Sequence, residues 1–180
     1  WSLEMIQGLL NKYGVKQLGY YVESLERSAE LFRTMLGTGP FVDLGVSEPE
    51  MLLYRGKESA MRSRCALGYL GNMQIELIEV QTEEPDVYKE LGHYGLHHIC
   101  IWADDVDQVI QDFTNADVNI AMEMISSQGL KVVYFDARET LGSFIEVNAP
   151  LAQLAEGIQA LSAKDDGNMP ALIPLQALMG

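Results

Sequence analysis

The sequence predicts an α+β fold in which two paired βαβββ modules form a curved, mixed-sheet cup, with an extra helix at each end of the chain. Two observations predict it: a pattern of strand, helix and further strands occurs twice, and the starts of the two patterns align without a gap. The 180 residues, 48% hydrophobic and 21% charged, can bury one sizeable core without disulfides.

The first module is expected over residues 15–81, after an amphipathic helix in residues 1–14 whose apolar side chains recur at helical spacing. Aromatic and β-branched residues predict its opening strand over 15–22. Ser24 can cap the helix that follows. The dipeptide Gly71-Asn72 is typical of a hairpin turn between two strands. The remaining segments of the module are expected to be extended: 41–46, 50–55, 62–70 and 73–80.

A linker follows over residues 82–95, where acidic and turn residues surround a short helical stretch. The second module is expected over 96–149, with a helix that begins at a capping residue, Asp105. A C-terminal helix and a tail occupy 150–180, and the tail is expected to be the least structured part because it is rich in Asp, Gly and Pro. The predicted elements of the second module are a strand over 96–103, a helix over 105–115, and strands over 118–125, 130–136 and 142–148.

The repeat places four polar side chains at equivalent positions. In the opening strands Gln17 aligns with His98, and in the closing strands Glu76 aligns with Glu146. If the modules pack about a pseudo-twofold axis, these side chains converge, because alternate strand residues share a face. One amide, one imidazole and two carboxylates suit one divalent ion: Zn²⁺, Ni²⁺, Mn²⁺, Co²⁺ or Fe²⁺. Taken singly, each residue is more simply a hydrogen-bonded or solvent-facing strand residue; the fourfold coincidence favours a metal site.

Residues that share a face with the four expected ligands are candidates for the wall of a substrate pocket. We expect four of them to contact substrate, namely Tyr21, Cys100, Trp102 and Phe144. His97 is expected to point to the opposite face as a structural residue. Among the cations on extended segments, Arg64 is the candidate for binding a substrate carboxylate or phosphate, and the alternative is that it pairs with the abundant surface acids.

Several stretches of the chain resemble the vicinal oxygen chelate superfamily, which includes glyoxalase I, methylmalonyl-CoA epimerase, bleomycin-resistance proteins and extradiol dioxygenases. They are QLGYYVESLERSAELF, LGYLGNMQIELIEV, GLHHICIWADDVDQV and GSFIEVNAP, and together they extend over residues 15–149. The resemblance implies paired βαβββ modules that hold one metal ion in the cup between them. Carried over by position, the ligands are Gln17, Glu76, His98 and Glu146, which is similar to the zinc-type glyoxalase I set.

A divalent ion that chelates two adjacent substrate oxygens lowers the pKa of the neighbouring C–H group, and a carboxylate beside it can then move the proton. Glu146 is the first choice for this role and Glu76 the second. We therefore expect a glyoxalase-like isomerase, epimerase or lyase that acts on a small oxygenated carbonyl substrate, thioesters included. The alternatives are a non-catalytic binding protein like the bleomycin-resistance proteins and, less favoured because Gln17 replaces an iron-binding histidine, a ring-cleaving dioxygenase.

The amino-acid composition of the chain disfavours some binding partners and some cellular compartments. Twelve Lys and Arg against 26 Asp and Glu give a net charge of −14, which disfavours nucleic acid and anionic membranes as partners. The N-terminal residues lack the layout of a signal peptide, and Cys65 and Cys100 are too isolated to suggest a disulfide scaffold. We therefore expect a cytoplasmic protein, and the resemblance implies a homodimer.

Overall fold

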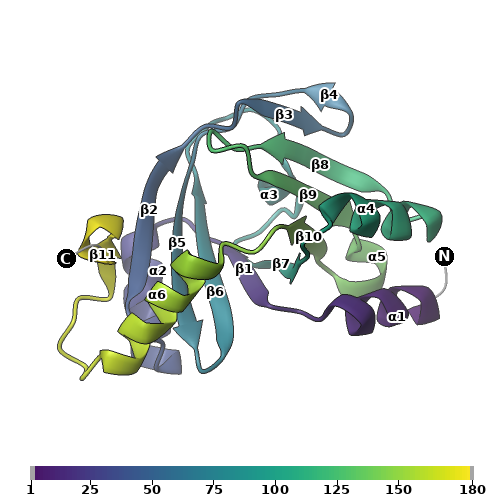
Figure 1. Cartoon of the computed structure of the whole chain (residues 1–180). Helices are drawn as coiled ribbons and strands as arrows, with labels where there is room; N and C mark the ends of the chain where they lie inside the picture. Colours follow the sequence, from purple (N-terminus) through teal and green to yellow (C-terminus); the bar gives the residue numbers. More distant parts are fainter. Residues whose placement is uncertain (1–2, 179–180) are drawn as a thin grey trace.

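The structure is a computed structural model that describes residues 3–178, so the outermost residues of the two predicted terminal segments, 1–2 and 179–180, lie outside it. Its strands form one curved, mixed sheet in the order β11-β2-β5-β6-β1-β7-β10-β9-β8-β3-β4. The two halves of this sheet meet where β1 pairs antiparallel with β7 (Figure 1). The predicted α+β class with a curved mixed sheet is confirmed.

The first half of the sheet is covered on one face by α2 (Leu25–Leu36). This helix begins where the Ser24 side chain accepts a hydrogen bond from the Arg27 amide, and it ends at Gly37, which has a left-handed conformation. Its buried residues pack against Ile75 and other apolar residues of the sheet. The strands of this half are β1 (Gln17–Tyr21), β2 (Phe41–Ser47), β5 (Ser63–Leu70) and β6 (Met73–Val80).

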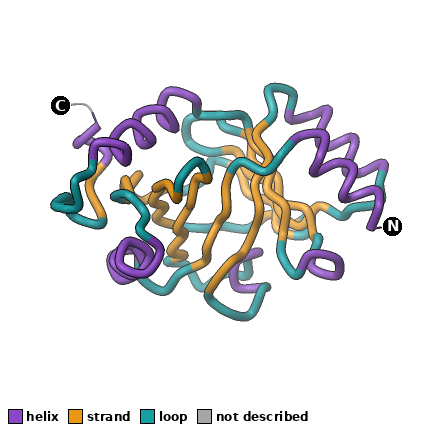
Figure 2. The backbone as a smooth tube through the Cα atoms, turned by 90° about the horizontal axis from the view of Figure 1, so that it is seen from below, coloured by secondary structure: helices purple, strands orange, loops and turns teal. Residues whose placement is uncertain are grey.

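The second half repeats the arrangement with α4 (Val106–Asn115), which begins where Asp105 accepts a hydrogen bond from the Gln108 amide. Phe113 of this helix packs against Ile145 and the rest of its sheet, and α1 (Leu3–Tyr13) adds apolar side chains to the same cluster. The other elements of this half are β7 (Gly95–Trp102), β8 (Ile120–Ile125), β9 (Lys131–Asp136), α5 (Arg138–Leu141) and β10 (Phe144–Asn148). Seen from below, the strands lie between the helices of the two halves (Figure 2).

One extended segment of the first half pairs in the second half. The stretch predicted as extended over 50–55 forms β3 (Met51–Tyr54), which continues into β4 (Lys57–Glu58). β3 pairs antiparallel with β8 and so extends the second half of the sheet (Figure 1). This pairing satisfies backbone groups that would otherwise be exposed along the edge of β8. The first half thus contributes an insertion to its partner half.

The C-terminal segment returns to the first half. After β10, α6 (Ala152–Lys164) packs on β5 through Ile158, and β11 (Leu172–Pro174) pairs parallel with β2. The tail, expected to be the least structured part, therefore contains a strand and a short 3-10 helix, η1 (Leu175–Leu178). The reason is that buried Ala171 and Ile173 complete the apolar clusters beneath it. None of the described helices is long and apolar enough to cross a membrane.

Candidate metal centre

Four adjacent strands at the middle of the sheet each contribute one of the predicted ligands. Their order is β6-β1-β7-β10, and these strands contain Glu76, Gln17, His98 and Glu146 respectively. Pairing is parallel within each half and antiparallel at the β1–β7 junction, where Gly19 lies opposite His98. The internal repeat therefore places equivalent residues symmetrically about the line between the two halves.

Three of these side chains meet in the interior. The Nε2 atom of His98 lies 2.8 Å from Oε2 of Glu146 and 3.4 Å from Oε2 of Glu76. One ligand atom from each residue falls within 4.8 Å of the other two. The His98 side chain is fully buried, while those of Glu146 and Glu76 are 5% and 16% exposed. His98 Nε2 forms no well-aligned hydrogen bond with any described residue, so it is directed at the carboxylates without being bonded to one of them.

The fourth residue, Gln17, presents an oxygen without a partner. Its side-chain Nε2 donates to Oε1 of Gln74 at 2.7 Å, and Gln74 Nε2 in turn donates to the Tyr69 hydroxyl at 3.2 Å. This chain orients the amide so that Gln17 Oε1 is buried and accepts no hydrogen bond from the described residues. Gln17 also lines the same cavity as Glu76 and Glu146. An unpaired buried oxygen is costly, so this amide oxygen is suited to coordinate a cation.

The orientation of His97, which precedes the expected ligand His98, is the main difference between the structure and the sequence prediction. In the β1–β7 ladder Gly19 pairs with His98 and Tyr20 with Leu96, so His97 is an extra, bulged residue. The bulge brings its ring to the same side as His98, with 3.1 Å between the two Nδ1 atoms. The expectation that His97 points to the opposite face is therefore wrong, because regular alternation fails at a bulge.

His97 also determines the tautomer of His98. The other ring nitrogen of His97, Nε2, lies 2.9 Å from the carbonyl oxygen of Val87, which can only accept. Burial, followed by the nearby His98, lowers the pKa of His97 to about 3, so it is neutral and has one N–H. That N–H donates to Val87, which leaves Nδ1 of His97 to accept from Nδ1–H of His98. The neutral form of His98 then has its lone pair on Nε2, the atom that faces the carboxylates.

Gly19 leaves room for the imidazole. A Cβ atom at this position would lie 1.9 Å from Cε1 of His98, far inside contact distance. Gly19 of β1 thus leaves free the space that the His98 side chain of β7 occupies. In the same pair of strands, the residue opposite Gln17 is Cys100.

The electrostatics of the cluster are dominated by the three ionisable groups themselves. Burial works against the charged form of His98, but Glu146 and then Glu76 outweigh it and raise its pKa to about 9. Burial also opposes the charge on Glu146, yet His98 and hydrogen bonds from Tyr134 and Asn148 lower its pKa. For Glu76 burial prevails and raises its pKa. In the absence of an ion, a proton on His98 therefore balances part of the negative charge.

Two tyrosines hold Glu146 in place, and sequence reasoning did not single them out. The Tyr134 hydroxyl donates to Oε2 of Glu146 at 2.6 Å, and the Tyr88 hydroxyl lies 2.7 Å from that of Tyr134. Asn148 Nδ2 donates to the other carboxylate oxygen at 2.5 Å. Tyr134 lies directly opposite Glu146 between β9 and β10. The signal is thus a cross-strand pair, which becomes visible only when the register is known.

The cluster opens into a cavity of about 250 Å³ between the two halves. Trp102, one of the predicted substrate contacts, lies on its wall. The other predicted contacts lie elsewhere: Cys100 is buried with its Sγ 3.7 Å from Glu146, and Phe144 stacks on His97 with ring centroids 4.9 Å apart. Tyr21 packs against Tyr88 and Tyr94, beside a separate surface pocket.

Arg64, the predicted substrate cation, lies between two carboxylates. Its guanidinium donates to Asp43 through Nε at 3.0 Å and through Nη2 at 2.5 Å, and Nη1 donates to Glu26 at 2.6 Å. It is not among the residues that line the cavity. The side chain therefore makes the alternative contact, an ion pair with surface acids.

The residues present fit a divalent ion. One imidazole nitrogen and two carboxylates lie close enough to share an ion, and Gln17, whose amide oxygen is unpaired, lines the same cavity. Zinc and similar metals accept such mixed nitrogen and oxygen donors in proteins. The outer contacts of His98 and Glu146 also fit, since a ligating histidine normally donates its second N–H and a ligating carboxylate is itself hydrogen-bonded. Such an ion would take the place of the proton on His98.

Comparisons with known proteins give the same picture of the fold. A family model described as "Glyoxalase/Bleomycin resistance protein/Dioxygenase superfamily" matches residues 16–135, a range that ends before Glu146. No curated protein sequence matches the chain.

Three solved structures share the fold at low sequence identity. A hypothetical protein from Bacillus halodurans is 20% identical with a TM-score of 0.55, over 76% of this chain and 94% of that one. Methylmalonyl-CoA epimerase from Mycobacterium tuberculosis is 18% identical with a TM-score of 0.53, over 79% and 91%. A Streptomyces coelicolor methylmalonyl-CoA epimerase variant in complex with 2-nitronate-propionyl-CoA is 20% identical with a TM-score of 0.53, over 77% and 94%.

Proposed function

The chain belongs to the glyoxalase/bleomycin resistance protein/dioxygenase superfamily, and from this membership and the geometry of its centre we propose that it is a metal-dependent isomerase, epimerase or lyase. It would move a proton α to the carbonyl of a small oxygenated substrate. The observation that carries the proposal is the meeting of Glu76, His98 and Glu146 at a buried cavity. The structural likeness to methylmalonyl-CoA epimerases supports the same reaction class, since epimerisation is itself a proton transfer of this kind.

Four side chains would hold the ion: Gln17, Glu76, His98 and Glu146. When bound, the ion would polarise two adjacent substrate oxygens and so lower the pKa of the neighbouring C–H group. Gln17 would offer its unpaired amide oxygen, and His98 its Nε2 lone pair. The walls of the cavity would exclude water and so strengthen these interactions.

The two glutamates differ in how firmly they are held, and this difference suggests separate roles. Glu146 accepts hydrogen bonds from Tyr134 and Asn148 and lies against His98, so its position is determined from three sides. Glu76 is more exposed and lies farther from His98. We therefore assign proton transfer to Glu76 and anchoring to Glu146, which reverses the order of preference that the sequence suggested.

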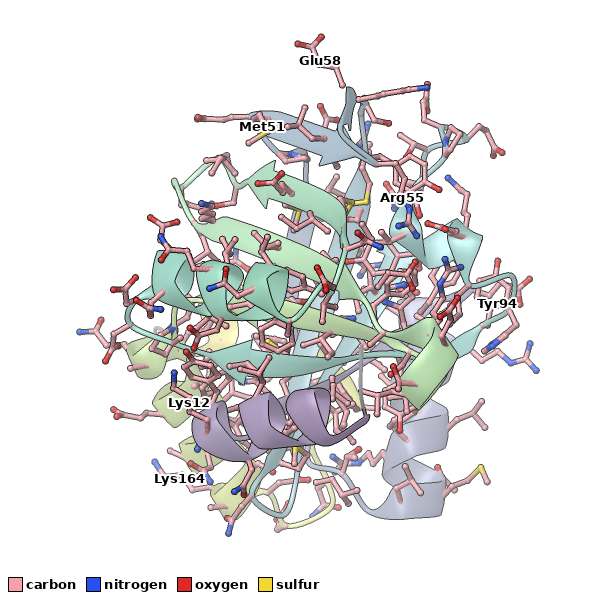
Figure 3. The ribbon with its side chains drawn as sticks, turned by 90° about the vertical axis from the view of Figure 1, so that its right-hand side faces the viewer. Lys12, Met51, Arg55, Glu58, Tyr94 and Lys164 are labelled. Carbon is pink, nitrogen blue, oxygen red and sulfur yellow. The ribbon has the colours of Figure 1, made fainter. Side chains whose placement is uncertain are left out.

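The test compares two substitutions with a matched control. Protein purified without added metal should contain about one transition metal per chain. Glu146→Gln should lower the metal content. Glu76→Gln should still bind metal when the metal is supplied at high concentration, but it should slow solvent-deuterium exchange into hydroxyacetone by roughly 10²–10⁴-fold. Glu58→Gln is the control because its side chain projects from β4 into solvent (Figure 3). Undiminished exchange in Glu76→Gln with loss in Glu146→Gln would return the proton transfer to Glu146.

A second function, binding without catalysis, is favoured by one observation. A protonated His98 forms an ion pair with Glu146 even without metal, so the centre can be stable as a structural feature. This alternative predicts protein that contains no metal at any stage and still binds small apolar molecules. The cytoplasmic location and the homodimer stay predictions from the sequence.

A further inference from the structure

We infer that the cavity takes a small uncharged molecule, an apolar body bearing two adjacent oxygen atoms, and rejects the same molecule when its body carries a carboxylate or phosphate. This inference rests on the proposed function and narrows its substrate class. It also separates this chain from the two methylmalonyl-CoA epimerases, because CoA esters carry several phosphate charges.

The cavity has charged groups of only one sign. The residues that line it include two carboxylates, Glu76 and Glu146, and no lysine or arginine among the residues the structure describes. Most of its surface comes from apolar and aromatic side chains that both halves provide, among them Met61, Trp102, Met124, Val132, Leu151 and Leu154. The loop between β8 and β9 adds only neutral residues, Ser126, Ser127 and Gln128.

The cations on segments around the cavity lie beside acidic side chains, and the loosest of these contacts is made by Arg62, which follows the lining residue Met61 and lies 3.8 Å from Glu48. Arg64 is held by Asp43 and Glu26. Arg55 and Arg138 share Glu90 and Asp136 in a second network. Lys131, at the start of β9, lies 2.7 Å from Asp107. Turning any of them toward a substrate would break these ion pairs.

A charged body would therefore enter an environment that has no compensation for it. A carboxylate or phosphate loses its hydration in an apolar cavity, and without a cation nothing replaces that loss. A divalent ion at the centre would be balanced by the two glutamates, so it would leave no net positive charge for a second anionic group. An uncharged body has no such cost, and its burial against the apolar walls is favourable.

The volume of the cavity limits the size of the ligand. A volume of about 250 Å³ lies below the roughly 300–1,000 Å³ of sites that bury drug-sized ligands. An apolar cavity of about 150 Å³ holds benzene, so this one accommodates a single ring with a few attached atoms. The N-terminal part of α6 closes one side through Leu154 and Ala155.

The experiment uses two probes that differ in one charge. Benzohydroxamic acid is neutral in solution and has two adjacent oxygens, whereas 4-carboxybenzohydroxamic acid adds a carboxylate to the far end of the ring. Calorimetric titration of the zinc-loaded protein should show the neutral probe binding at least tenfold more tightly. Equal or tighter binding of the carboxylated probe would overturn the inference.

A pair of charge-matched variants sharpens the result. Gln128→Lys places a cation at the lining of the cavity in an exposed loop, and Gln153→Lys makes the same charge change on exposed α6 outside the lining. Only Gln128→Lys should raise the affinity of the carboxylated probe, by severalfold, with the neutral probe unaffected. An equal gain in both variants would attribute the preference to overall charge and contradict the assignment to the cavity.

Failure of this inference and failure of the proposed function give different results. If the protein binds zinc and exchanges solvent deuterium but prefers the carboxylated probe, only the inference fails. If the protein binds no zinc, the proposed function fails. The preference of the cavity for an uncharged ligand is then measured on the metal-free protein, by ligand-observed NMR with benzyl alcohol and benzoate. There the neutral compound should again bind more tightly, because the carboxylates of Glu76 and Glu146 repel benzoate.

Discussion

At the scale of the residue, the chemistry of His98 depends on His97, the residue beside it. His97 donates to the Val87 carbonyl and accepts from His98, so it relays a backbone contact to the candidate ligand. A ligating histidine commonly bonds directly to a carbonyl or carboxylate, and here a second imidazole stands between. His97 is also wedged between the rings of Tyr88 and Phe144, which leaves it little freedom to turn. We therefore propose that His97 positions His98 for the expected ion.

Replacing His97 tests this role. His97→Phe preserves the stacking on Phe144 and removes the acceptor for His98 Nδ1–H, so zinc affinity should fall about 10–100-fold. His97→Asn, which retains an acceptor, should lose less. Both affinities can be measured by competition with a chromogenic chelator, with circular dichroism to verify the fold. If the Phe variant bound zinc as tightly as the parent protein, the relay would have no role in metal binding.

At the scale of the element, the β3–β4 insertion is joined to the second half by a charged network as well as by backbone pairing. Arg55, in the turn between these strands, lies 2.6 Å from both Glu90 of the short helix α3 (Val87–Glu90) and Asp136 at the end of β9. Arg138 of α5 contacts the same two carboxylates at 2.7 Å. Figure 3 shows Arg55 beside α3, beneath the projecting strand that ends near Glu58. The network therefore connects insertion, linker and second half.

This network makes part of the stability depend on pH. Hydrogen bonds from Arg138 and Arg55, against the opposing effect of burial, lower the pKa of Asp136 in the folded protein. The stabilisation is therefore present above the unfolded-state value of about 3.9 and is lost as the pH falls below it. Asp136→Asn should unfold at lower urea concentration than the parent at pH 6, and the gap should shrink toward pH 3. Exposed Asp107→Asn serves as the control, and a gap independent of pH would contradict the argument.

At the scale of the whole molecule, the expected metal centre lies on the junction of the two halves. Gln17 and Glu76 come from the first half and His98 and Glu146 from the second, on strands that are adjacent in one continuous sheet. β3 crosses from the first half to the second, and α6 with β11 crosses back. Such exchange of elements makes it unfavourable for either half to unfold alone.

Metal binding should therefore stabilise the chain as one unit. Zinc at a hundredfold excess over its dissociation constant should add about 2.7 kcal/mol, which corresponds to a rise in Tm of roughly 5–10 °C for a domain of this size. Far-ultraviolet circular dichroism and tryptophan fluorescence should report one coincident transition. Glu146→Gln should remove most of the shift, and a chelator should reverse it. Two separate transitions, of which metal raised only one, would show that the halves are independent.

Local patterns in the sequence were sufficient to predict the fold class and the superfamily, which the structure and the family match confirm. The reason is that hydrophobic periodicity and helix caps lie within a few consecutive residues, and that the internal repeat is found by aligning the sequence with itself. The same repeat also identified the four polar residues that lie on neighbouring strands at the junction of the two halves. It could do so because alternate residues of a strand lie on the same face of the sheet.

The tertiary structure decided what depends on register and on distant partners. It turned His97 toward His98 through a bulge, placed Tyr134 opposite Glu146, and paired β3 with the other half. It also left Arg64 between two carboxylates and the cavity without a cation among its described lining residues. Each of these facts joins residues that are far apart in the chain, and the free energy that selects them comes from packing and pairing across the sheet, which no local pattern contains.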